Sequence, residues 1–100
     1  MTDGNASIIF HRKLSWTSSA LQLAVRLDDR EVARLRIGNT VTVDVPPGSH
    51  VVKVMYGNRE VKYSNRAGSM PVAVGPDETL RVNLRTTARP FKVELTADKL

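Results

Sequence analysis

The chain has 100 residues, no cysteine, 41% hydrophobic residues and a formal net charge of +5. This length fits one domain with one core, and the lack of cysteine excludes disulfides, zinc–thiolate sites and thiol nucleophiles. No run of about 18 apolar residues is present and the first residues lack a signal-peptide pattern, so we expect a cytoplasmic protein without a transmembrane segment.

Hydrophobic residues alternate with polar ones along most of the chain, as is typical of strands with one buried face. We expect a flexible N-terminal segment over residues 1–7 and a single domain over residues 8–97. In chain order, the expected strands lie at residues 8–14, 21–27, 41–45, 52–56, 70–74, 80–85 and 91–95. The segment 30–37 is interpreted as a further short strand with a bulge. Seven to nine short strands predict an all-β, antiparallel β-sandwich, with a small β-barrel as the alternative.

The strand phases also predict which side chains form the core. The expected core residues are Leu23, Val25, Leu27, Val43, Val52, Val54, Val82, Leu84 and Val93.

A stiff corner, Pro46-Pro47-Gly48, separates two of the expected strands. Proline fixes φ near −65° and Gly48 can take the positive φ of a type II turn, so we expect a structural turn that reverses the chain. His50 follows this corner. The second histidine, His11, is distant in the sequence and no cysteine accompanies either, so a structural or surface role is favoured over metal binding.

The segments LAVRLDDREVARL (residues 23–35) and GNTVTVDVPPGSHVVKV (residues 38–54) resemble PEGA-type domains and related bacterial β-sandwich domains of unknown function. The shared features are a strand, an acidic turn, a short returning strand, and a proline–glycine corner followed by histidine and valines. The resemblance covers residues 8–56. It implies an Ig-like or PEGA-like sandwich and a non-catalytic module of bacterial envelope or multidomain proteins.

No recognisable catalytic set occurs in the sequence. The serines lie outside a Gly-x-Ser-x-Gly pattern, the glycines are scattered singly, and the pair Asp28-Asp29 lacks the rest of a calcium loop. We therefore interpret Asp28-Asp29 as a turn, and we expect no enzyme activity and no cofactor or metal.

Two kinds of binding remain. The first is protein–protein interaction or scaffolding, with an unknown protein or a second copy, through exposed strand edges or through Trp16 and Tyr63. Trp16 could instead plug one end of the sandwich. The second is binding of nucleic acid or anionic lipid, for which the candidate contacts are Arg26, Arg34, Arg36, Arg81, Arg85 and Lys92. The chain has few aromatic residues for stacking on bases, so protein interaction is favoured.

Overall fold

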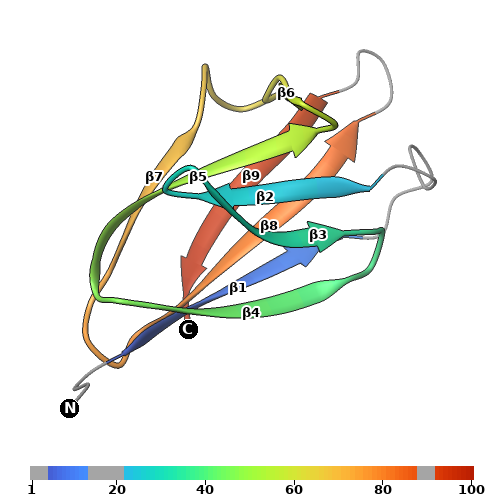
Figure 1. Ribbon diagram of the computed structural model, residues 1–100. Helices are drawn as coiled ribbons and strands as arrows, with labels where there is room; N and C mark the ends of the chain where they lie inside the picture. The colour runs from blue at the N-terminus through green and yellow to red at the C-terminus, as the bar shows by residue number, and fades with distance from the viewer. Residues whose placement is uncertain (1–4, 14–21, 88–91) are drawn as a thin grey trace.

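The computed structural model describes residues 5–13, 22–87 and 92–100 (Figure 1). These residues form nine strands in two packed sheets that do not close into a barrel, which confirms the predicted all-β sandwich. The strands are β1 (Ala6–Arg12), β2 (Leu23–Leu27), β3 (Arg30–Leu35), β4 (Thr40–Val45), β5 (Gly48–Tyr56), β6 (Arg59–Glu60), β7 (Met70–Val74), β8 (Thr79–Thr87) and β9 (Lys92–Lys99). The described residues contain no helix, and hence none that could span a membrane.

Sheet 1 has the strand order β4-β1-β8-β9, and sheet 2 has the order β3-β2-β5-β6, with β7 also paired to β5. The ladders are antiparallel, as predicted, except that β1 runs parallel to β8. The exception follows from the topology. Because β4 and β8 run in opposite directions, β1 between them can be antiparallel to only one of the two.

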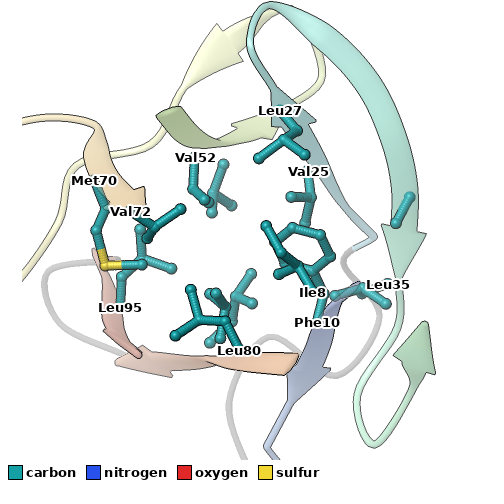
Figure 2. Close-up of a cluster of buried hydrophobic side chains, with 14 of the residues drawn as sticks. Ile8, Phe10, Val25, Leu27, Leu35, Val52, Met70, Val72, Leu80 and Leu95 are labelled. Carbon is teal, nitrogen blue, oxygen red and sulfur yellow. The ribbon is translucent and has the colours of Figure 1, made fainter. Parts of the chain in front are cut away.

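The core lies between the two sheets, where the inward side chains of both meet (Figure 2). Eight of the nine expected core residues are buried: Leu23, Val25, Leu27, Val52, Val54, Val82, Leu84 and Val93. The prediction for Val43 is wrong, since its side chain is only partly buried. Val43 belongs to β4, an outermost strand of sheet 1, and therefore packs against the rim of the core.

The strand boundaries differ slightly from the predicted ones. β1 begins at Ala6, which is fully buried, so this strand starts two residues before the strand expected at residues 8–14. β9 extends to Lys99, beyond the strand expected at residues 91–95. Leu14, Leu21 and Phe91, which the sequence places in strands, lie outside the described residues.

The hairpin between β2 and β3 follows the predicted turn chemistry. Asp28 and Asp29 have φ values of 53° and 66°, and positive φ at both central residues is the mark of a type I′ turn. The pairing register of β2 with β3 shifts between Val25 and Arg26, which confirms the bulge expected in segment 30–37. A bulge of this kind increases the local twist of the strand that carries it.

Replacing Val54 by Ala is expected to lower the free energy of unfolding by about 2 kcal/mol, through lost transfer free energy plus the cavity left behind. Val54 is fully buried on β5. Urea denaturation measures the change. Val51, on the same strand and 37% exposed, is the matched control, and Val51→Ala is expected to cost less than about 0.5 kcal/mol. Equal costs at both positions would contradict the strand phase.

The Pro46-Pro47 corner connects the two sheets, because β4 lies in sheet 1 and β5 in sheet 2. Gly48 has a φ of 132°, so the predicted positive φ is confirmed. This value is larger than the φ of about 80° at the third position of a type II turn. The difference arises because Gly48 is already the first residue of β5 and is paired with Val74.

Replacing Gly48 by Ala is expected to cost about 1 kcal/mol of stability, since an L-residue adopts this φ only with strain. No atom lies within 4 Å of a Cβ added at Gly48, so the cost comes from the backbone alone. Gly68 is the control, because its added Cβ also meets open space but its φ lies outside the positive range. If thermal unfolding gives Gly48→Ala and Gly68→Ala the same midpoint, backbone strain at Gly48 is refuted.

Candidate functional site

The two aromatic residues predicted as partner contacts have different outcomes. Trp16 lies outside the described residues. Tyr63 does not present an exposed ring, and that expectation is corrected: its side chain is 7% exposed. The Tyr63 hydroxyl accepts a hydrogen bond from the backbone N–H of Val54 at 3.0 Å and donates one to Glu60 Oε2 at 2.8 Å. Burial raises the pKa of the Tyr63 phenol well above its usual range, so the hydroxyl stays protonated.

The six basic residues predicted as anion contacts do not share one face. They divide between the two sheets, whose exposed side chains point to opposite sides of the sandwich. Those on or next to sheet 2 are Arg26, Arg34 and Arg36, and those on sheet 1 are Arg81, Arg85 and Lys92.

Carboxylates stand beside several of these arginines. In the β8–β9 ladder, Arg81 lies directly opposite Asp98 and Arg85 directly opposite Glu94. Opposite charges at facing positions of two strands attract each other, which lowers the positive potential that an arginine offers to an outside anion. On sheet 2, Arg34 forms an ion pair with Glu31 at 2.8 Å. The outer faces are therefore mixed in charge.

A concentration of positive charge lies instead around Tyr63. A pocket of about 370 Å³ is lined by Lys62, Arg66 and Lys92, with Glu60 contributing one carboxylate. Of the residues predicted for anion contact, only Lys92 lies in this pocket. The pocket thus combines one predicted anion contact with basic residues of the segment that follows β6.

His50 links three separate parts of the fold. Its side chain is 7% exposed, and its Nδ1 lies 2.5 Å from Oδ2 of Asp28 in the β2–β3 turn. Its Nε2 lies 2.7 Å from the carbonyl oxygen of Pro46 in the corner. A carbonyl oxygen can only accept, so Nε2 donates to it, and Nδ1 can donate to the carboxylate only if the ring carries both protons. The contacts therefore favour an imidazolium ring.

The pKa values of the pair shift in the directions that these contacts require. The hydrogen bond to Asp28 raises the pKa of His50, and the same hydrogen bond lowers the pKa of Asp28. Asp28 also accepts a hydrogen bond from the backbone N–H of Val51 at 2.8 Å. The charged pair thus ties the turn, the corner and β5 together.

The geometry of His50 favours a structural role over a catalytic one. A general base must offer one ring nitrogen to the proton it removes, and both nitrogens of His50 are engaged by the protein itself. A cleft of about 370 Å³ opens beside the ring, with Glu31 and Asp44 among its lining residues. Within the described ranges, no group of three or more potential ligands is placed to hold a metal ion.

Two strands at the edges of sheet 2, β3 and β7, carry features that hinder pairing with another strand. At one edge, β3 carries the bulge described above, and a bulged edge strand is a poor template for strand addition. At the other edge, Pro71 of β7 lies opposite Val51 of β5. The N–H and C=O groups of Val51 both bond Asp28, on the β2 side of β5, so Val51 and Pro71 exchange no backbone hydrogen bonds. The backbone of Pro71 therefore points away from β5, and because proline has no N–H, it interrupts the row of donors along this edge.

The β9 edge of sheet 1 is covered along its first half. The N–H of Val93 donates to the carbonyl of Lys62 at 2.9 Å, and the N–H of Ser64 donates to the carbonyl of Val93 at 3.0 Å. The side chain of Asn65 continues this pairing, since its Nδ2 donates to the carbonyl of Leu95 at 2.6 Å and its Oδ1 accepts from the N–H of Leu95 at 3.2 Å. The Asn65 carboxamide thus takes the place of a peptide group.

The β4 edge of sheet 1 is open. The N–H of Arg12 donates to the carbonyl of Asn39 at 3.0 Å, which fixes the phase of the β1–β4 ladder. Because antiparallel ladders alternate, every second residue of β4 directs its N–H and C=O away from β1. These outward residues are Thr40, Thr42 and Asp44. Among the described residues, β4 has no proline, no register shift and no segment paired to its outer side, and Figure 1 shows it as an outermost strand.

Comparison with models of known protein families finds no match, and comparison with curated proteins finds none either. The resemblance of residues 8–56 to PEGA-type domains stays a prediction.

Proposed function

We propose that this domain is a non-enzymatic protein-interaction or scaffold module that binds by strand addition at the open edge of β4. The single observation that carries the proposal is the contrast between edges. A bulge interrupts β3, Pro71 interrupts β7 and Asn65 covers the first half of β9, whereas among the described residues no segment pairs with the outward N–H and C=O groups of β4 from Thr40 to Asp44. An open edge is a ready template for another strand, and backbone hydrogen bonds then supply the affinity.

The resemblance supports two finer parts of this proposal. We propose a bacterial, PEGA-like module, because the strand, turn and corner of residues 8–56 follow that pattern. We also propose a cytoplasmic location, on the sequence features given above.

Proline at an outward position of β4 tests the proposed mode of binding. Thr42→Pro removes an outward N–H without removing a bond to β1, so the fold is expected to survive while strand addition is blocked. Ala73→Pro is the matched control, since Ala73 is two residues from Pro71 and shares its outward backbone orientation.

The assay is quantitative capture of proteins from a lysate of the source organism on immobilised domain, at low and at high salt. We expect capture to survive high salt, to be lost with Thr42→Pro and to be kept with Ala73→Pro. Capture that is insensitive to Thr42→Pro and disappears at high salt would overturn strand addition, because only electrostatic contacts are screened in this way.

Anion binding is a second candidate, and the pocket lined by Lys62, Arg66 and Lys92 is the observation in its favour. Purified domain mixed with labelled single- and double-stranded nucleic acid, and separately with anionic vesicles, provides the test. If binding persists at about 0.15 M salt, where the screening length is about 8 Å, and falls with Lys62→Ala and Arg66→Ala, the anion function is favoured. If only Arg81→Ala and Arg85→Ala reduce it, the outer face of sheet 1 binds instead.

A further inference from the structure

We infer, resting on the proposed interaction function, that the strand added at the β4 edge is β4 of a second copy of this chain. The two strands pair antiparallel about a two-fold axis and join two copies of sheet 1 into one continuous sheet. Such an interface is isologous, so the same residues must serve both sides and the edge must be complementary to itself.

The backbone of β4 meets this condition in one register. With the axis at Thr42, Thr42 faces its own copy, and Thr40 faces Asp44 of the second copy. All three are outward residues, so each facing pair exchanges two backbone hydrogen bonds, about six in all. If the axis lies at Val41 or Val43 instead, only two pairs of outward residues face each other and the third outward residue has no partner on the other β4. If the axis lies between two residues, each outward residue faces one whose N–H and C=O groups point toward β1. The register at Thr42 therefore satisfies the most backbone groups.

The side chains on the outer face are complementary in the same register. His11 Nδ1 lies 2.8 Å from Oγ1 of Thr40 within one copy. When His11 Nδ1 carries a proton and donates to Oγ1, the Thr40 hydroxyl can donate across the axis to the carboxylate of Asp44, which also accepts from Ser7 at 3.2 Å. Each copy thus offers a hydroxyl donor where the other offers a carboxylate acceptor.

The charge distribution and the inner face also fit a second copy. Asp44 is the one charged residue of β4, and the two copies of Asp44 lie about four residues apart along the joined strands, roughly 14 Å, so their repulsion is weak. On the inner face, Val41 of one copy faces Val43 of the other. Both valines are only partly buried in the single chain, and pairing covers them.

Single cysteines test the register directly, because the chain contains no cysteine of its own. Facing residues that exchange hydrogen bonds have Cα atoms about 5.5 Å apart, within the range of about 4.4–6.8 Å that a disulfide requires. Thr42→Cys is therefore expected to form a cross-linked dimer under mild oxidation. Thr40→Cys alone and Asp44→Cys alone are expected to cross-link several-fold less, whereas a mixture of these two variants cross-links to the level of Thr42→Cys.

Sedimentation of the chain without added cysteine gives an independent readout. We expect a concentration-dependent dimer that Thr42→Pro abolishes and Ala73→Pro retains. A monomer at all concentrations, or equal cross-linking of Thr40→Cys, Thr42→Cys and Asp44→Cys, would overturn the two-fold pairing.

The failure of this inference is distinguishable from the failure of the proposed function. If the chain is monomeric but Thr42→Pro still abolishes capture of another protein, the second copy is the wrong occupant and strand addition stands. If neither dimerisation nor capture depends on Thr42, both are refuted.

Discussion

Replacing His50 by Ala is expected to lower the free energy of unfolding by about 2 to 3 kcal/mol at pH 6, more than the cost at Gly48. The sequence suggests the opposite order, because a histidine after a turn resembles a surface residue. The structure gives the larger cost to His50, because its side chain is buried and both ring nitrogens are hydrogen-bonded. Its loss leaves the Pro46 carbonyl without its donor and a void beside the corner. The Asp28 carboxylate is 46% exposed, so water replaces part of its lost bond and the cost stays moderate.

The contribution of His50 to stability is expected to depend on pH. The pKa of His50 is raised in the folded state, so its contribution is full below the unfolded value of about 6.5 and disappears as the pH rises through the folded value. The pKa of Asp28 is lowered, so its contribution is present above about 3.9 and disappears as the pH falls through its folded value. The pair is therefore fully effective between about pH 4 and 6.5.

Urea denaturation from pH 4 to pH 9 measures this dependence. The difference between the unmodified chain and His50→Ala is expected to shrink as the pH rises above the folded pKa. His11 is the only other histidine and lies on the outer face of sheet 1, so His11→Ala serves as the control and leaves the pH dependence in place. A constant difference across this range would mean that His50 is not charged in the folded state.

Replacing Arg12 by Ala is expected to cost about 3 kcal/mol. Arg12 is the last residue of β1 and is fully buried, and its Nη1 donates to the carbonyl of Leu35 at 3.0 Å. Burial lowers the pKa of the guanidinium, because desolvation disfavours the charged form. Alanine would leave the Leu35 carbonyl without this donor and would leave a cavity the length of the lost side chain.

Arg12→Met separates packing from charge. Methionine keeps most of the apolar volume of the arginine stem and requires no desolvation of a charge, but it also leaves the Leu35 carbonyl without its donor, so we expect a cost of about 1 to 2 kcal/mol, less than that of Ala. Chemical denaturation of both variants gives the comparison. If Met is as damaging as Ala, the guanidinium contacts rather than the packing stabilise this end of β1.

Local patterns in the sequence carry most of the fold. Period-two runs predict the strands, and the bulge in β3 and the positive φ of Gly48 follow from local turn chemistry. Arg12 was missed as a core residue although it continues the alternation of Ile8 and Phe10 within the expected strand 8–14, since a charged residue is usually expected to be exposed. The fully buried position shows that the alternation itself was the better signal.

Contacts between distant segments could not be predicted in the same way. Asp28 reaches His50 only because β2 pairs with β5 in a register that places Leu27 opposite Val52. Tyr63 is buried because its segment returns to the start of β9 and bonds Val93. Neither pairing leaves a local signal, and the openness of the β4 edge likewise depends on which strands pair with which.

The parallel pairing of β1 with β8 has a consequence for the order in which the chain can fold. Ile8 lies opposite Leu80, so the strand that begins the described structure needs a partner from near its end. Sheet 2 can assemble from segments closer in the chain, since β2, β3 and β5 all lie between Leu23 and Tyr56. Contacts between residues so far apart in the chain form only after a large loss of loop-closure entropy. Sandwiches dominated by such contacts fold in milliseconds to seconds. During synthesis, β1 therefore leaves the ribosome before the other described strands and waits for β8 to complete its pairing.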